Sequence, residues 1–171
     1  MIPVIHSERL TFRSWREGDF DAFASVYTDA EQSRFIGGPM SRDDAWRRMA
    51  SFVGHWSLRG FGIWALEDKT TGAFVGWSGL WFPEGFPERE IGWTLVPAFR
   101  GRGLAQEAGA RVRAFAYDTL GWPTVTSLIN FDNVASVRVA EKLGAAVERA
   151  VHFRGADSWI YRHPANAKAA A

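Results

Sequence analysis

"EIGWTLVPAFRGRGLAQEA", residues 90–108, contains the change from strand to helix that decides the fold. Its opening residues are apolar, aromatic and β-branched, which is typical of a strand, here one that ends near Leu95. The turn RGRG interrupts this pattern, and good helix formers follow from about Leu104. A strand, a glycine-rich turn and a helix in this order leave backbone N–H groups unpaired at the positive end of a helix dipole. The stretch therefore indicates an anion site.

The chemistry of the RGRG turn favours a pyrophosphate. Gly101 and Gly103 have no side chain that would keep a phosphate away from the backbone, and Arg100 and Arg102 can add charge-assisted hydrogen bonds. The G-K-[ST] ending of a nucleoside-triphosphate loop and the G-x-G-x-x-G spacing of dinucleotide folds are both missing, so those ligands are disfavoured. The alternative is a turn whose arginines are simply solvated.

Periodicity and turn signals predict a strand, two helices, three strands, a helix, a strand, a helix and two final strands. The expected strands are Arg9–Trp15, 61–68, 73–81, 90–95, 124–129, Ala146–Phe153 and Ser158–His163. The expected helices are Asp19–Thr28, 41–56, one from about Leu104 and one from about Asn133. Because the sequence KTTG predicts a hairpin between the second and third strands, the three consecutive strands should form an antiparallel meander.

Capping residues and apolar spacing define the helices more closely. Ser41 followed by Asp44 predicts a capped helix start, and Gly144 predicts a left-handed helix end. Helical spacing in the 41–56 segment predicts a core-facing stripe made of Trp46, Met49, Phe52, Val53 and Trp56.

Composition narrows the class of protein. The 171 residues suit one domain, expected over residues 1–165 with a flexible tail at 166–171. The net charge of +1 gives no general attraction for nucleic acid or membranes, and the absence of cysteine excludes thiolate chemistry. The four histidines lack metal-ligand spacing, so no metal is expected. Without a leader or a long apolar run, we expect a cytoplasmic protein, either a monomer or a homodimer.

The sequence resembles the GNAT N-acetyltransferase superfamily. Its signature R/Q-x-x-G-x-G/A is matched by Arg100, Gly103 and Ala105, between an expected strand and an expected helix. The segments ERLTFRSWREGDFDAF, NVASVRVAEKLGA and RGADSWIY, in this order, are most similar to the ribosomal-protein-alanine N-acetyltransferase branch. The resemblance implies a single α/β (α+β) domain. Its central sheet would be mixed, mostly antiparallel, with about seven strands splayed in the middle and about four flanking helices.

The same resemblance implies acetyl-coenzyme A as co-substrate. Its pyrophosphate would bind the backbone N–H groups of the turn, and its pantetheine would pair with the backbone of the splayed strand. The implied cofactor-binding residues are Trp93, Leu95, Arg100, Gly101, Arg102, Gly103, Leu104, Ala105, Asn133 and Ser136.

Acetyl transfer to nitrogen needs a neutral amine, so a proton acceptor helps. The resemblance suggests Glu90 for this role, although it could be an ordinary strand-edge glutamate. Many family members carry a tyrosine near the leaving thiolate, but no tyrosine lies between Tyr117 and Tyr161. Ser136 stands there instead and could donate a hydrogen bond to sulfur, or it could serve with Asn133 only to cap a helix.

The acceptor side is expected at Trp81, Phe82 and Phe86, for which core packing is the alternative. We expect an N-acetyltransferase with direct transfer in a ternary complex to a protein N-terminus or a small primary amine. The alternative is a catalytically silent acyl-coenzyme A sensor or interaction protein, and a nucleic-acid-binding module is a more distant one.

Overall fold

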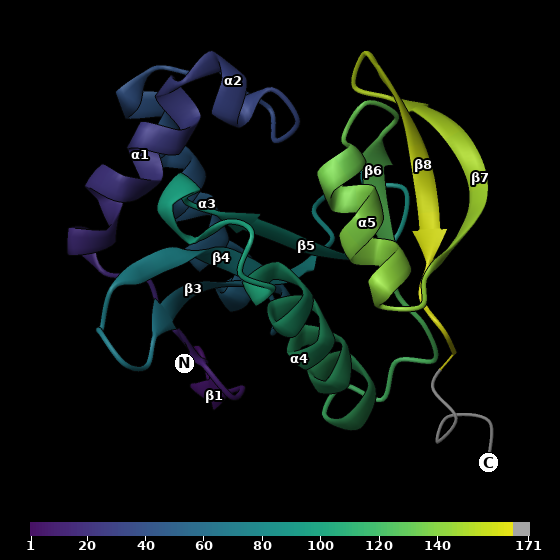
Figure 1. The fold of residues 1–171 in the computed structure, drawn as a ribbon, viewed down its shortest axis with the longest axis horizontal. Coiled ribbons are helices and arrows are strands. Elements are labelled where there is room, and N and C mark those ends of the chain that lie inside the picture. Colours follow the sequence, from purple (N-terminus) through teal and green to yellow (C-terminus); the bar gives the residue numbers. More distant parts are fainter. Residues whose placement is uncertain (166–171) are drawn as a thin grey trace.

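Eight strands form one mixed sheet in the computed structural model, which describes residues 1–165 (Figure 1). The strands are β1 (Ile5–His6), β2 (Leu10–Arg13), β3 (Ile63–Asp68), β4 (Phe74–Trp81), β5 (Glu90–Leu95), β6 (Thr126–Asn130), β7 (Ala146–Phe153) and β8 (Ala156–Arg162). Their order across the sheet is β1-β2-β3-β4-β5-β6-β8-β7, and every neighbouring pair is antiparallel except β5 with β6. The predicted meander is confirmed as β3-β4-β5.

Five α-helices and two short 3-10 turns flank this sheet. They are η1 (Glu17–Asp19), α1 (Phe20–Thr28), α2 (Ala30–Ser33), α3 (Arg42–Arg59), η2 (Pro97–Phe99), α4 (Leu104–Asp118) and α5 (Val134–Lys142). The fold class is as expected, with one more strand and one more helix than the sequence indicated. The additional elements are β1 and α2, both too short to produce a readable period. Residues 166–171, expected as a tail, lie outside the described residues.

The caps expected from the sequence are present. The Ser41 side chain accepts a hydrogen bond from the Asp44 N–H at the start of α3. The Asn133 side chain does the same for the Ser136 N–H at the start of α5, and Gly144 follows α5 with a φ of +78°. These local signals were readable because each cap satisfies a backbone group within three residues.

Helices cover both faces of the sheet (Figure 1). On one face, α1 and α3 pack with Trp77 in a cluster that includes Phe23, Tyr27 and Phe52. On the other face, α4 contributes to a second cluster, made of Leu10, Phe12, Trp64, Leu66, Leu80, Ile91, Leu95, Leu104, Ala108, Val112 and Phe115 among others. A smaller third cluster lies between α5 and the strands β6 and β8. Figure 1 shows α4 and α5 in front of the two halves of the sheet.

The predicted core stripe of α3 is only partly correct. Met49, Phe52 and Trp56 are buried, but Trp46 is 45% and Val53 42% exposed. The buried face of α3 begins at Ala45 and continues at intervals of three or four residues, so both exposed side chains lie one position round the helix from it. Spacing alone could not distinguish the centre of the face from its flank.

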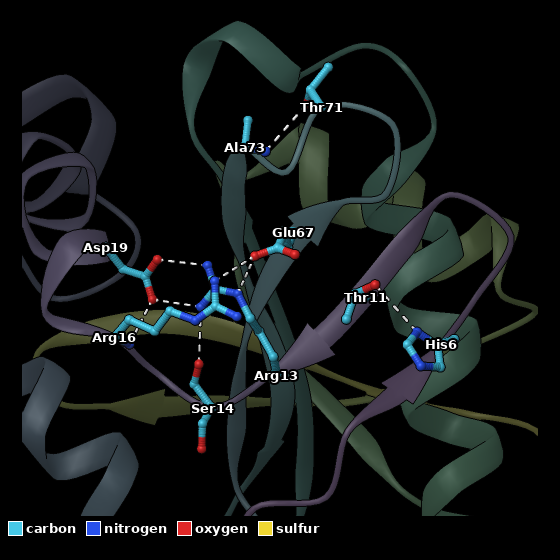
Figure 2. Close-up of polar contacts among 9 residues, drawn as sticks. All are labelled: His6, Thr11, Arg13, Ser14, Arg16, Asp19, Glu67, Thr71 and Ala73. Atoms are coloured by element: carbon cyan, nitrogen blue, oxygen red, sulfur yellow. Dashed lines mark hydrogen bonds and ion pairs between the residues drawn. The ribbon is translucent and has the colours of Figure 1, made fainter.

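A buried ion pair joins the first helical layer to the sheet. Arg13 of β2 donates two hydrogen bonds of 2.8 Å to the Asp19 carboxylate, and its Nε donates to Glu67 of β3 at 2.6 Å (Figure 2). Asp19 also accepts a hydrogen bond from the Arg16 N–H at 2.9 Å. Arg13 and Asp19 are both buried, so this bidentate pair fixes where α1 starts relative to β2 and β3.

Replacing Arg13 with Met should lower the free energy of unfolding by about 3–5 kcal/mol, because it leaves the Asp19 charge buried without its partner. Urea unfolding measures this loss. Adding Asp19→Asn to the same protein should restore part of it. Arg47→Met is the control, since Arg47 forms only exposed ion pairs with Asp43 and Asp44, and it should have no measurable effect. An equally small effect of Arg13→Met would contradict the assigned role.

Candidate active site

The RGRG turn has the geometry of an anion cradle. Gly101 and Gly103 have φ values of +74° and +76°, a left-handed backbone that favours glycine. The helix α4 begins directly after Gly103. Within the described part of the chain, no group accepts a hydrogen bond from the backbone N–H groups of residues 102–105. These donors therefore remain available to a phosphate at the positive end of the helix.

Three contacts hold this turn in place. The Arg100 Nε donates to the Leu95 carbonyl at 3.0 Å, so this side chain ties the turn to the end of β5. The Arg9 Nη1 donates to the Arg102 carbonyl at 2.8 Å. Glu107, in the first turn of α4, accepts hydrogen bonds from the Ser7 hydroxyl at 2.6 Å and from the Arg9 Nε at 2.6 Å. The cradle is thus fixed before any ligand binds.

The strands β5 and β6 separate after a single registered pair, Glu90 with Thr126. The Thr126 N–H donates to the Arg89 carbonyl at 3.0 Å. In a continuous parallel ladder the next bond would join the Leu128 N–H to the Ile91 carbonyl. Instead, the Leu128 N–H meets the Glu90 Oε2 at 3.3 Å, and the Ile91 carbonyl accepts from the Ser127 hydroxyl at 2.9 Å. Two side chains replace one ladder bond, and the sheet opens there.

The opening exposes the backbone of β5. The Arg89 and Ile91 carbonyls face β6, and main-chain groups alternate along a strand, so those of Trp93 and Leu95 face the same side. The Leu95 carbonyl is occupied by Arg100. The Trp93 side chain points toward α4, where a Cβ on Gly109 would lie 3.2 Å from its ring. Gly109 therefore lets α4 approach the splayed strand closely.

A buried histidine forms a hydrogen bond at the β5–β6 seam, the place where these two strands separate. His163 is 1% exposed, and its Nε2 lies 3.0 Å from the Ser127 hydroxyl. Burial and the charge of Arg113 lower the pKa of His163 to about 4, so the ring is neutral near pH 7. Because the Ser127 hydroxyl donates to Ile91, its oxygen accepts from the His163 Nε2–H. This chain of bonds anchors β6 to β5 at the point where they diverge.

Glu90 lies at the seam and lines the cavity beside it. Burial raises the pKa of Glu90 to about 8, although the Leu128 N–H and the charge of Arg154 act in the opposite direction. A carboxyl group with such a pKa holds a proton at neutral pH and becomes a base just above it. This behaviour is typical of a group that exchanges protons with an amine.

The cavity has a volume of about 350 Å³ and is bounded by both halves of the sheet. Its lining residues include Tyr27, Arg34, Arg48, Trp77, Trp81, Phe86, Glu90, Gly92, Trp93, Ser127, Asn133, Ser136 and Arg154. Trp81 stacks on His55 with ring centroids 4.5 Å apart, and Phe86 packs edge-on against Phe153 at 5.0 Å. The aromatic wall and Glu90 therefore share one space with the N-terminal end of α5.

Phe82, expected with Trp81 and Phe86 on the acceptor side, does not line this cavity. It packs against the cluster on the other face of the sheet, and its N–H donates to the His55 Nε2 at 3.3 Å. Successive residues of an extended segment point to opposite sides, so Trp81 and Phe82 cannot both face the acceptor.

Comparisons with known proteins identify the family in which this arrangement occurs. A family model described as an acetyltransferase (GNAT) domain matches residues 9–146. The chain belongs to the GNAT acetyltransferase family. A crystal structure of an acetyltransferase from Agrobacterium tumefaciens str. C58 is 32% identical to this GNAT domain, with a TM-score of 0.88 over 96% of this chain and 95% of that chain. Membership makes the chain an enzyme of the acyltransferase class.

Two further relatives of this GNAT domain are more distant. YoaA of Bacillus subtilis (strain 168), an uncharacterized N-acetyltransferase, is 24% identical over 147 residues, which are 84% of this chain and 83% of YoaA. RimL, a ribosomal L7/L12 α-N-protein acetyltransferase solved in complex with coenzyme A, is 17% identical with a TM-score of 0.78, covering 96% of this chain and 99% of that one. At that identity the likeness to RimL shows the fold alone.

The structure of the GNAT domain brings Asn133 and Ser136 to the cavity, where both are partly buried. The Asn133 side chain caps α5 through the Ser136 N–H at 3.2 Å, which leaves the Ser136 hydroxyl uncommitted among the described residues. Capping and a role toward the leaving group are therefore compatible.

Sequence reasoning missed three cavity arginines, Arg34, Arg48 and Arg154. Arg154 and Gly155 form the turn between β7 and β8, where both residues have positive φ, but nothing in the sequence placed this turn near Glu90. Among residues 1–165 there is no cluster of three or more His, Cys, Asp or Glu side chains arranged to hold a metal. None of the helices in this range is long and apolar enough to span a bilayer.

Replacing Gly103 with Glu should weaken binding of coenzyme A about tenfold or more, because the new side chain brings bulk and negative charge to the free N–H groups. Calorimetric titration with coenzyme A measures this. Gly121→Glu is the matched control: Gly121 has a φ of +67°, open space around it and a place beyond the opposite end of α4. Equal affinities of the two variants would refute the assigned cradle.

Proposed function

We propose that this chain transfers an acetyl group from acetyl-coenzyme A to a primary amine by direct attack in a ternary complex. The single observation that carries the proposal is the break in the sheet between β5 and β6, with the buried Glu90 carboxyl group at the point where the strands separate. Free N–H groups lie on one side of this break and an aromatic cavity on the other. Acetyl-coenzyme A supplies the activated acyl group as a thioester.

The residues present fit this co-substrate. The N–H groups of residues 102–105 would hold the pyrophosphate, with Gly103 leaving room and Arg102 adding charge. Arg100, bonded to Leu95, acts as a positioning residue for the turn. The Trp93 backbone, facing the opening, offers the pantetheine amides a strand edge to pair with.

Glu90 is proposed as the base that takes a proton from the incoming ammonium, directly or through water. Its ionised form is available just above its raised pKa, where an α-amino group is also partly neutral. As the tetrahedral intermediate forms, backbone N–H groups of β5 that face the opening stabilise its oxyanion, that of Trp93 among them. As the intermediate collapses, its nitrogen loses its second proton to solvent and the carbon–sulfur bond breaks. The Ser136 hydroxyl donates a hydrogen bond to the departing thiolate, which then takes a proton from solvent.

The proposal predicts that the purified chain releases free thiol from acetyl-coenzyme A when an acceptor is present. The first assay uses a panel of peptides with free N-termini and a panel of small primary amines. Release with one panel identifies the acceptor class. Tight binding of coenzyme A with no release across both panels would instead favour an acyl-coenzyme A sensor.

Glu90→Gln should lower kcat/KM about 100-fold or more above pH 8, while the difference from wild type should shrink toward pH 6. The sign follows from the raised pKa: Glu90 is protonated at low pH in the wild type, so the variant loses a base only where that base exists. pH profiles of kcat/KM are measured with two acceptors of different amine pKa. The change in rate that comes from Glu90 should stay near pH 8 with both acceptors, whereas the change that comes from the amine should move with the pKa of the acceptor.

Glu84→Gln serves as the control for this experiment, since Glu84 is exposed on the preceding loop and does not line the cavity. Its profile should match the wild type. If Glu90→Gln keeps the wild-type limb near pH 8, Glu90 is not the base. Thermal unfolding of both variants confirms that each is folded.

A further inference from the structure

Three arginines line the cavity, whose lining includes no residue of the RGRG turn. They come from separate segments: Arg34 follows α2, Arg48 lies within α3, and Arg154 lies at the turn between β7 and β8. Among residues 1–165, Glu90 is the only one in the lining that carries a carboxyl group. The space is therefore strongly cationic, although the whole chain carries a net charge of only +1.

Arg48 is the most informative of the three. It is partly buried, and within residues 1–165 no carboxylate lies within ion-pair distance of it. Its guanidinium would lie 3.4 Å from a Cβ on Gly37, at the rim of the cavity. Burial raises the pKa of the neighbouring Tyr27 to about 12 even though the charge of Arg48 opposes this, so Tyr27 is neutral and does not compensate Arg48.

The other two arginines also have little negative charge near them to balance their own. Arg34 has one carboxylate partner, Glu31 at 3.5 Å, and this pair is exposed and so contributes little. The Arg154 guanidinium stacks on Phe86 and Phe153, at 5.5 Å and 5.0 Å from the ring centroids, and forms no ion pair with any described carboxylate. Stacking on aromatic rings holds a guanidinium in place without using its hydrogen-bond donors.

The phosphates of a coenzyme do not account for these charges. The N–H groups proposed to bind the pyrophosphate are at residues 102–105, and none of these residues lines the cavity. The arginines instead line the same cavity as Trp81, Phe86 and Glu90, which the proposed function assigns to the amine. Positive charge there repels an ammonium group, so it is unfavourable unless the acceptor brings a negative group with it.

We propose that the acceptor is a primary amine that also carries an anionic oxygen group, a carboxylate or a phosphate, which the three arginines bind while the amine meets Glu90. This inference rests on the proposed function and narrows its substrate class. Arg48, the least exposed of the three, acts as the main anion-binding residue, and Arg34 and Arg154 add to its positive charge. The aromatic side chains fill the apolar part of the same acceptor.

Substrate pairs test the proposal in the wild-type enzyme. In each pair one member carries the anionic group and the other does not: γ-aminobutyrate with its amide, phosphoethanolamine with ethanolamine, and the dipeptide amides Ala-Glu and Ala-Gln. Initial rates of thiol release from acetyl-coenzyme A, corrected for the fraction of neutral amine, give kcat/KM for each. We expect the anionic member of at least one pair to exceed its neutral partner about tenfold or more, as charge-assisted hydrogen bonds imply. The preferred pair distinguishes carboxylate from phosphate and free acid from peptide.

Arg48→Gln should remove this preference: the ratio of kcat/KM between the anionic acceptor and its neutral partner should fall about tenfold, through a higher KM for the anionic acceptor. Arg154→Gln, on an exposed turn that tolerates substitution, is a second variant expected to act in the same direction. Arg47→Gln is the matched control, because Arg47 neighbours Arg48 in α3 but pairs with Asp43 and Asp44 outside the cavity. It should behave as the wild type.

The outcomes separate this inference from the function on which it rests. Equal kcat/KM values within every pair, or a preference that survives in both Arg48→Gln and Arg154→Gln, would overturn the anionic acceptor and leave the acetyltransferase intact. No thiol release with any acceptor, charged or neutral, would overturn both. A preference for an anionic member that is lost in Arg48→Gln alone or in both variants supports the proposal.

Discussion

The exchange of one ladder bond for two side-chain bonds at the β5–β6 seam determines the site. The Glu90 carboxyl group accepts a hydrogen bond from the Leu128 N–H, and the Ser127 hydroxyl donates one to the Ile91 carbonyl. Neither backbone group is therefore left without a partner where the strands separate. A sheet cannot open in its middle unless the freed groups find other partners, because buried unpaired N–H and C=O groups are costly. The seam therefore accounts for the stability of the opening, whereas the burial of Glu90 raises the pKa of its carboxyl group against the effect of the Leu128 bond.

The opening divides the molecule into two sides with different chemistry. On the α4 side, backbone N–H groups and glycines offer a surface for phosphate that depends little on side chains. On the α3 side, aromatic rings and guanidinium groups offer a surface that depends almost entirely on side chains. The first suits a ligand common to a whole family, and the second can change from one member to the next without disturbing the sheet.

Much of the fold was predictable because its signals are local. The meander, the start of α4 and the caps at Ser41 and Asn133 each follow from residues a few positions apart. The position of the RGRG turn between a strand and a helix could be predicted in the same way. The arginines of the cavity could not, since they come from three segments that meet only in the folded sheet. Phe82 lies outside the cavity because a one-residue step reverses the side of a strand. Trp46 was wrongly assigned to the core because the flank of a helix has nearly the same spacing as its centre.

The bond between Arg9 and Glu107 joins residues 98 positions apart, and it fixes the turn that begins α4. Closing a loop of that length costs conformational entropy, which the packing of the intervening helices and strands must offset. The rigidity of the turn therefore depends on the first residues of the chain, which lie far outside the 90–108 segment. A change near the N-terminus that releases Arg9 would loosen the turn although no residue of the turn itself has changed.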